Sequence, residues 1–284
     1  MLAIGGRLGD ITTRGYTLLD VPRPRQTLVH VHPDPDELGR VYEPELPIVS
    51  DLTEFAAALA RILPVDSSAW RTWTEAARAD YLANLRHTPQ PGDLDLGDVL
   101  AFLRERLPGD AILTNGAGNF TVWAHRFYEY SQYGTQLAPR SGAMGYGFPA
   151  ALAAKALHPG RIVVCFAGDG DFMMSAAELA TAVQYELPVV CLVVNNGMYG
   201  TIRMHQERSY PGRVIGTDLV NPEFADYARS FGCYGETVER TAEFEAAFER
   251  AVASGLPAVI DLRVHPEAIH PQHTIAGIRA AASA

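Results

Sequence analysis

The chain is poor in the residues that mark several classes of protein. Its three cysteines, Cys165, Cys191 and Cys233, are dispersed and form no C-x-x-C pair. We therefore expect buried, unpaired thiols in a reducing compartment and no zinc or iron–sulfur site. Lys155 is the only lysine, and its alanine-rich surroundings do not suggest Schiff-base chemistry. No apolar run reaches the roughly 18 residues that a membrane-spanning helix needs.

Positive charge is also scarce. The chain has 23 lysines and arginines against 33 acidic residues, a formal net charge of −10. This balance argues against a general nucleic-acid or anionic-membrane surface, although backbone N–H groups or a metal ion could still hold a local anion. The N-terminus, MLAIGGRLGD, lacks the basic and apolar segments of a signal peptide. We expect a cytoplasmic protein that binds neither nucleic acid nor membrane.

Residues 1–62 predict part of an α/β domain. Short strands are expected at 2–4, 27–32 and 47–50, followed by an apolar-periodic helix at 52–62. This region looks too small to be a complete domain. Residues 63–92 are predicted to be a helical linker, because a helix at 67–85 is followed by two prolines and a glycine within His87 to Gly92.

Residues 93–265 have the regular alternation of a parallel α/β domain. Strands are expected at 111–114, 136–138, 162–167, 189–194, near Thr237 and at 258–264, and helices at 96–107, 147–157, 176–187, 222–231 and 243–254. The runs 162–167 and 189–194 are continuously apolar, as in strands covered on both faces. The pattern predicts a doubly wound parallel sheet preceded by a partial second α/β domain. Residues 266–284 would form an ordered arm or a loose tail.

Glycine-rich loops follow three predicted strands. They are Asn115–Asn119, Ser141–Gly145 and Gly168–Asp171. Glycine at such positions lets the backbone approach a ligand closely and offer N–H groups to phosphate. In a doubly wound sheet, ligands bind at the carboxyl ends of the strands. The three loops therefore indicate a binding site for a phosphate-containing ligand.

The end of the strand 189–194 supplies a partner for the third loop. It continues into Asn195-Asn196-Gly197, so Asp169 and Asn196 would lie side by side at adjacent strand ends. Their oxygen atoms suit Mg²⁺, which also retains phosphate oxygens and water as ligands. A lone Gly-Asp-Gly or Asn-Asn-Gly is usually only a turn. Both together, at neighbouring strand ends, predict a diphosphate–metal site.

The same residues resemble a known family. Gly168-Asp169-Gly170, with Asn196 27 positions beyond Asp169, looks like the signature of thiamine-diphosphate enzymes. The segment 141–151, SGAMGYGFPAA, is similar to the acetolactate synthase and benzoylformate decarboxylase branch. Residues 93–265 resemble the diphosphate-binding domain of that branch. Residues 1 to about 60 resemble the second half of its central domain.

The resemblance implies thiamine diphosphate and Mg²⁺ as cofactors. The metal ligands would be the side chains of Asp169 and Asn196 and the backbone carbonyl of Met198. Gly170 and Asp171 would offer backbone N–H groups to the diphosphate, although many relatives have serine at position 171. The Gly142 carbonyl would accept a hydrogen bond from the aminopyrimidine, and Met144 would support the bend of the cofactor. The further cofactor-binding positions are Asn115, Gly116, Gly118, Asn119, Ala143, Gly168, Tyr199 and Gly200.

The implied reaction is decarboxylation of a 2-oxo acid, followed by release of an aldehyde or by carboligation to a product such as acetolactate. The glutamate that activates the cofactor in this family lies in a pyrimidine-binding domain with no counterpart in this sequence. We therefore expect this chain to form only half of the site and to be inactive alone. It would function as a homodimer or with a chain that supplies the missing domain. Truncation of the reading frame is favoured over a natural split or a deliberate excision.

The substrate pocket is less well defined by the sequence. His205 stands where acetolactate synthases carry a tryptophan, and it could be a pocket group or a surface residue. Half of a central domain should not hold flavin, so none is expected. One alternative is the β subunit of a 2-oxo-acid:ferredoxin oxidoreductase, which would be expected to carry clustered cysteines. The other is an inactive fragment that binds the cofactor weakly or only dimerises.

Overall fold

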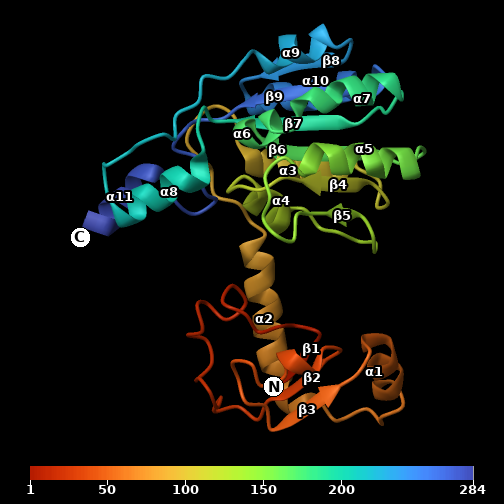
Figure 1. The fold of residues 1–284 in the computed structure, drawn as a ribbon, viewed down its shortest axis with the longest axis vertical. Coiled ribbons are helices and arrows are strands. Elements are labelled where there is room, and N and C mark those ends of the chain that lie inside the picture. The colour runs from red at the N-terminus through yellow and green to blue at the C-terminus, as the bar shows by residue number, and fades with distance from the viewer. Residues whose placement is uncertain (284) are drawn as a thin grey trace. The chain divides into compact units, whose positions relative to one another are not determined.

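The structure, a computed structural model, describes residues 1–283 and divides into two compact units. The first unit is Met1–Glu75, and the second begins at Ala76. The helix α2 (Arg71–Asn84) crosses this boundary in the sequence, after a short turn of 3-10 helix at Ser68–Trp70. Figure 1 shows the elements of both units.

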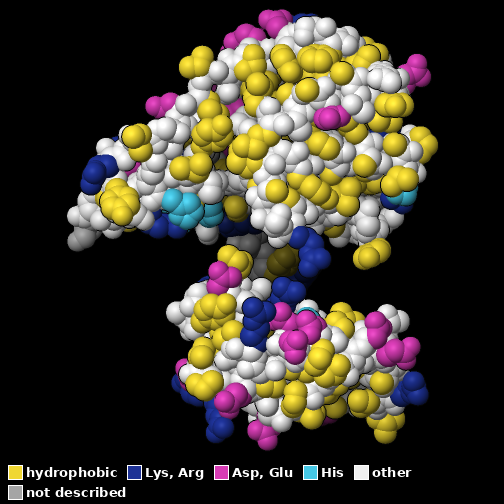
Figure 2. All heavy atoms as spheres, viewed as in Figure 1, with side chains coloured by type: hydrophobic (Ala, Val, Ile, Leu, Met, Phe, Trp, Pro, Cys, Tyr) yellow, Lys and Arg dark blue, Asp and Glu magenta, His cyan; other side chains and the backbone are white. Residues whose placement is uncertain are grey.

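The first unit contains a small parallel sheet. Its strands β1 (Leu2–Ile4), β2 (Val29–His32) and β3 (Leu46–Val49) lie in the order β1-β2-β3 and are followed by the helix α1 (Leu52–Leu59). Leu19, Leu28 and Tyr42 form the core of this unit. Many other apolar side chains of the unit are exposed, including Leu2, Ile4 and Val49, and Figure 2 shows hydrophobic side chains over its surface. The partial α/β domain predicted here is therefore present as a sheet with limited cover.

The second unit contains a six-stranded parallel sheet. In chain order its strands are β4 (Ile112–Asn115), β5 (Gln136–Leu137), β6 (Val163–Gly168), β7 (Val190–Asn195), β8 (Tyr234–Val238) and β9 (Ala258–Arg263). Across the sheet they lie in the order β5-β4-β6-β7-β9-β8. All residues of β6 and β7 are buried, as their continuous apolar runs predicted. After β5 the chain crosses β4 to form β6, so the winding of the sheet reverses beside β4.

Helices cover both faces of this sheet. One face carries α3 (Leu96–Arg106), α4 (Thr121–Phe127) and α10 (Thr241–Ala253) over a core that includes Trp123 and Phe248. The other carries α5 (Gly147–Leu157), α6 (Asp169–Met173), α7 (Leu179–Gln184) and α9 (Phe224–Ser230) over a core that includes Phe148 and Phe224. This two-sided cover confirms the doubly wound α/β fold.

Three local predictions differ from the structure. Gly168–Asp171 is not a free turn, because Asp169 begins the helix α6. The helix expected at 176–187 is shorter, with a 3-10 turn at Ala176–Glu178 followed by α7. The sequence also predicts Ser175 as the N-cap of this helix, because serine is a preferred N-cap residue. Ser175 does precede the 3-10 turn, but its buried Oγ makes no hydrogen bond among the described residues. The tail is an ordered arm that contains the helix α11 (Ile275–Ser283), which packs on α8 (Gly200–Ser209).

The three cysteines are free and buried, as predicted. Cys165 on β6 and Cys191 on β7 are cross-strand neighbours within the core. Between residues 1 and 283, none of the helices combines the length and the apolar character that would be needed to cross a membrane.

Candidate functional site

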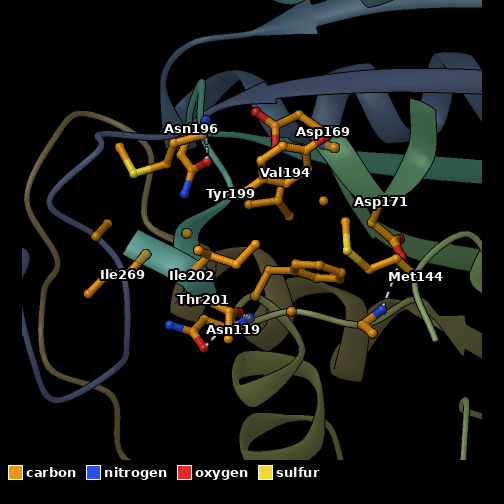
Figure 3. Close-up of a pocket in the computed structure, with 18 of the residues that line it drawn as sticks. Asn119, Met144, Asp169, Asp171, Val194, Asn196, Tyr199, Thr201, Ile202 and Ile269 are labelled. Atoms are coloured by element: carbon orange, nitrogen blue, oxygen red, sulfur yellow. Dashed lines mark hydrogen bonds between the residues drawn. The ribbon is translucent and has the colours of Figure 1, made fainter. Parts of the chain in front are cut away.

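A cavity opens at the carboxyl ends of the strands of the second unit. Figure 3 shows its lining, which comes from the ends of β6 and β7, the loop after β4 and the helix α8. It lies beside the reversal of winding at β4, which is where doubly wound sheets bind ligands. The sequence-predicted residues that line it are Gly118, Asn119, Met144, Gly168, Asp169, Gly170, Asp171, Asn196, Met198, Tyr199 and Gly200.

Asp169 is held firmly at the end of β6. Its Oδ1 accepts a hydrogen bond from the Gly170 N–H at 2.9 Å, and its Oδ2 accepts from the Gly197 N–H at 2.9 Å and from Asn221 Nδ2 at 2.8 Å. Burial raises the pKa of Asp169, and these three hydrogen bonds oppose that rise. The carboxylate is thus oriented by donors from three separate segments.

Asn196 directly follows β7 and lines the same cavity as Asp169. Its Oδ1 accepts a hydrogen bond from the Met198 N–H at 3.2 Å, which closes a tight turn around Gly197. Gly197 has a φ of +70°, a conformation that favours glycine. Because the Gly197 N–H also binds Asp169, the two strand ends are joined directly. Carboxylate and amide oxygens therefore face one cavity, a donor set suited to a hard cation.

The glycines of the loop after β4 and of the β6 end permit close packing. A Cβ atom on Gly118 or on Gly168 would lie 2.7 Å from the ring of Phe120. A Cβ atom on Gly116 would overlap the carboxylate of Asp171. Any larger residue at these three positions would have to displace its neighbours, so the shape of the loop depends on glycine.

The side chain of Asp171 joins two of the glycine-rich loops. Its Oδ1 accepts hydrogen bonds from the Ala117 N–H at 3.0 Å and from the Gly145 N–H at 2.9 Å. The residue is 3% exposed, and this burial raises the pKa of Asp171 against the effect of both hydrogen bonds. The sequence suggested a role only for the backbone N–H of Asp171. The structure adds a carboxylate that fixes the spacing between the loops.

Four predicted positions lie outside the cavity lining. Asn115 is buried behind the first loop, where its Nδ2 donates to the Gly116 carbonyl at 2.8 Å and its Oδ1 lies 3.0 Å from His125 Nε2. Gly142 and Ala143, like Asn115 and Gly116, are not among the lining residues. His205 is exposed on α8 and does not line this cavity either.

Apolar residues that the sequence did not single out complete the lining. They are Leu96, Ala117, Phe120, Trp123, Val194, Ile202, Ala268 and Ile269, together with the polar Thr201. Thr201 Oγ1 donates to Asn119 Oδ1 at 3.0 Å and thereby links the first loop to α8. The sequence offers no reason to distinguish most of these residues from other buried apolar residues of the core. The only signal for Ala268 and Ile269 was the possibility of an ordered tail.

The tail is held over α8 by a buried acid. Glu207 is fully buried and accepts hydrogen bonds from Arg279 on both carboxylate oxygens, at 2.6 and 2.8 Å. It also accepts from Arg203 Nε at 3.0 Å and from the Gly212 N–H at 2.9 Å. These donors, Arg279 foremost, lower the pKa of Glu207 to about 2. The contact positions Ile269, whose side chain packs over Gly200 at the cavity.

A second group of possible ligands has a simpler explanation. His87, Asp95 and Asp98 bring their ligand atoms within 4.8 Å of one another. Asp95 caps α3 by accepting from the Gly97 N–H, and its other oxygen accepts from the Gln90 N–H. His87 pairs with Asp98 at 3.0 Å. Helix capping and one histidine–aspartate contact account for all three side chains.

The fold and the position of the cavity define a doubly wound α/β ligand-binding domain. Two family models identify it further. The C-terminal thiamine pyrophosphate-binding domain of thiamine pyrophosphate enzymes matches residues 116–262, and the central domain of the same enzymes matches residues 1–59. The chain belongs to the thiamine pyrophosphate enzyme family.

Individual relatives agree with this family. The acetolactate synthase large subunit of Corynebacterium glutamicum is 33% identical over 283 residues, a match that covers 94% of this chain and 44% of that protein. The acetolactate synthase large subunit of Parasynechococcus marenigrum is 31% identical over 274 residues, covering 93% and 43%. This chain thus spans less than half the length of these curated relatives.

A solved structure gives the same result. The thiamine diphosphate-dependent 4-hydroxybenzoylformate decarboxylase of Rhodococcus jostii RHA1 matches with a TM-score of 0.69 and 28% identity. The match covers 84% of this chain and 44% of that one. The predicted family and the fold class are therefore confirmed, and thiamine diphosphate is supported as the cofactor of the family.

Proposed function

We propose that this chain forms the diphosphate- and magnesium-binding half of a thiamine diphosphate site that acts on 2-oxo acids. The observation that carries the proposal is the convergence of Asp169 and Asn196 on one cavity. They come from adjacent strand ends joined by the Gly197 hydrogen bond, beside loops that only glycine allows to pack. Oxygen ligands beside the glycine-rich loop after β4 suit a diphosphate bound through Mg²⁺.

In this proposal each residue has a distinct task. Asp169 and Asn196 hold Mg²⁺ through side-chain oxygens, and Met198 through its backbone carbonyl. Burial disfavours the charged form of Asp169, so its metal-free carboxylate is costly and a bound cation relieves that cost. Gly170 and Asp171, at the start of α6, and the loop after β4 would face the diphosphate, although the Gly170 N–H donates to Asp169 Oδ1 in this structure. Met144 lies at the cavity edge, where it would support the bent cofactor.

Apolar side chains, among them Phe120, Ile202 and Ile269, also line this cavity. Water that a bound cofactor displaces from them would strengthen the electrostatic interactions at the polar residues. Thiamine diphosphate, when bound, supplies the carbon nucleophile and the electron sink for loss of carbon dioxide from a 2-oxo acid. The residues of this chain bind and orient it.

The names of the matched proteins support a 2-oxo acid as the substrate class. The Rhodococcus enzyme is named for 4-hydroxybenzoylformate, which is a 2-oxo acid, and for its decarboxylation. The curated relatives are named for the synthesis of acetolactate, a carboligation product. We extend to this chain only the shared chemistry, decarboxylation with or without carboligation.

We further propose that the acid that activates the aminopyrimidine comes from a pyrimidine-binding domain outside residues 1–284. These residues would work with that domain, in a homodimer or with a chain that supplies it, and would be inactive without it. The β subunit of a 2-oxo-acid:ferredoxin oxidoreductase is disfavoured by two observations. The three cysteines are buried in the sheet core, and residues 1–59 match the central domain of the present family.

Turnover assays test this function. The chain would be supplied with thiamine diphosphate, Mg²⁺ and either pyruvate or benzoylformate, alone and with a separately produced pyrimidine-binding domain of a relative. We expect release of carbon dioxide only from the mixture, and its loss in Asp169→Ala. A stable complex that binds the cofactor but releases no carbon dioxide from either acid would instead mean an inert cofactor-binding chain.

A further inference from the structure

Asn221 joins the predicted metal ligand to the neighbouring strand. It lies in the segment before α9, 52 residues from Asp169 in the sequence. Its Nδ2 donates to Asp169 Oδ2 at 2.8 Å and to Asn195 Oδ1 at 3.0 Å. Because a side-chain amide nitrogen carries two hydrogens, both donors of Asn221 are used. No residue with a single donor could make the same pair of contacts.

The hydrogen bonds continue from Asn195 on β7 to the neighbouring strand β9. Asn195 Nδ2 donates to Asp261 Oδ1 at 3.0 Å, and Arg263 Nε donates to Asp261 Oδ2 at 2.7 Å. Asn195 is 6% exposed and Asp261 is fully buried. Arg263 in turn donates to Glu223 at 2.6 Å, two residues after Asn221. The segment 221–223 is therefore anchored at both ends by one polar network, which runs from the buried Asn195 and Asp261 to the exposed Glu223.

This network leaves one oxygen of Asp169 available to the cavity. Oδ2 accepts two hydrogen bonds, from Gly197 and Asn221, which occupy both of its lone pairs. Oδ1 accepts one hydrogen bond from another described residue, the Gly170 N–H, and so retains a lone pair for a cation. Without Asn221, the carboxylate could rotate and offer either oxygen to a cation.

We infer that Asn221 is a positioning residue for the metal site: it holds Asp169 so that Oδ1 alone serves as the magnesium ligand. The inference rests on the proposed function, since it concerns the same ion. Groups that orient a metal ligand typically affect metal affinity by about 10–100-fold when they are removed. Asn221 acts through Asp169 and does not itself touch the ion.

The test measures metal binding and does not depend on turnover. Mn²⁺, which also prefers oxygen ligands, replaces Mg²⁺. Its binding to the full chain in the presence of thiamine diphosphate is followed by electron paramagnetic resonance. We expect Asn221→Ala to weaken Mn²⁺ binding by about 10–100-fold. Asn221→Ser, which has one donor on a shorter side chain, should show the same direction of change and serves if the alanine variant does not fold.

A matched control separates positioning from general loosening of the segment. Gln206 also anchors the chain before Asn221, since its Nε2 donates to the Ile215 carbonyl at 2.8 Å and its Oε1 accepts from the Ile215 N–H at 3.1 Å. It does not line the cavity. Gln206→Ala should therefore keep the Mn²⁺ affinity of the unsubstituted chain. An equal loss in Gln206→Ala would show that Asn221 only secures the segment, and would overturn the inference.

The remaining outcomes are distinguishable. If the unsubstituted chain binds Mn²⁺ and the folded Asn221 variants bind it equally well, the inference is wrong and the proposed function stands. If the unsubstituted chain shows no Mn²⁺ binding with thiamine diphosphate, the proposed function fails and the inference fails with it.

Discussion

The contact between Glu207 and Arg279 should make the stability of this chain depend on pH in the acid range. Glu207 is fully buried and receives hydrogen bonds from two arginines and one backbone N–H, so its pKa falls from 4.5 to about 2. A carboxyl group with a depressed pKa in the folded state stabilises that state above its unfolded pKa. This contribution should be complete above about pH 5 and be lost progressively as the pH falls toward 2.

The magnitude follows from the size of the shift. At about 1.4 kcal/mol per pKa unit, the depression corresponds to at most roughly 3 kcal/mol. The Arg279 side chain is 44% exposed, and solvent screening weakens such pairs. We therefore expect Glu207→Gln to lower the free energy of unfolding at pH 7 by about 1–2 kcal/mol. The difference from the unsubstituted chain should fall to about half or less at pH 3.

Urea unfolding at pH 7 and pH 3 measures both quantities. Glu249 provides the control, because it pairs with Arg106 and its pKa is also lowered, yet its side chain is 42% exposed. Glu249→Gln should cost less than about 1 kcal/mol at either pH. A loss for Glu207→Gln that is the same at pH 7 and pH 3 would refute the reasoning, because it would mean that the charge of Glu207 contributes nothing.

Three further predictions concern the loops of the site. Asp171→Ala should leave the Ala117 and Gly145 N–H groups without their acceptor and lower the free energy of unfolding in urea by about 2–4 kcal/mol. Asp171→Asn retains an acceptor oxygen and should lower it by only about 1 kcal/mol. Equal losses in the two variants would contradict the role of the carboxylate. Gly116→Ala should lower the melting temperature, because the added Cβ would overlap Asp171. Gly160→Ala, whose Cβ would meet open space, should change the melting temperature little. A similar effect of both substitutions would argue against close packing of Gly116 on Asp171. His205→Ala should bind thiamine diphosphate in calorimetry as the unsubstituted chain does, since His205 is exposed and does not line the cavity; an affinity loss near tenfold would place it in the site.

The sequence predicted the sheet of the second unit well because its strands carry a strong local signal. β6 and β7 are continuous apolar runs, and a strand covered on both faces requires such a run. The two strand ends carry Asp169 and Asn196, so a parallel sheet made their convergence predictable. The glycine-rich loops were predictable because they follow predicted strands, and because close packing of the backbone at a strand end leaves no room for a side chain.

The contacts that hold these groups in place depend on distant parts of the chain. Asn221 lies 52 residues from Asp169, and Arg279 lies 72 residues from Glu207. The sequence around each of these residues does not predict its partner, because the pairing depends on how the helices pack on the sheet. Ser175 is a similar case. It is a favourable residue type for an N-cap, yet its side chain makes no capping hydrogen bond.

The role of the Asp171 side chain was missed because many relatives have serine at this position, so the resemblance implied only a backbone role. In the structure the carboxylate accepts hydrogen bonds from the N–H groups of Ala117 and Gly145. Only the positions of both loops in space reveal this use of the side chain.

The central claim is that this chain binds thiamine diphosphate through a metal held by Asp169. The most direct measurement is calorimetric titration of thiamine diphosphate into the purified chain, with and without Mg²⁺, and into Asp169→Ala. The account predicts binding that requires Mg²⁺ and is abolished in the variant. Binding of equal strength without Mg²⁺ or in Asp169→Ala, or no binding to a chain shown to be folded, would contradict it.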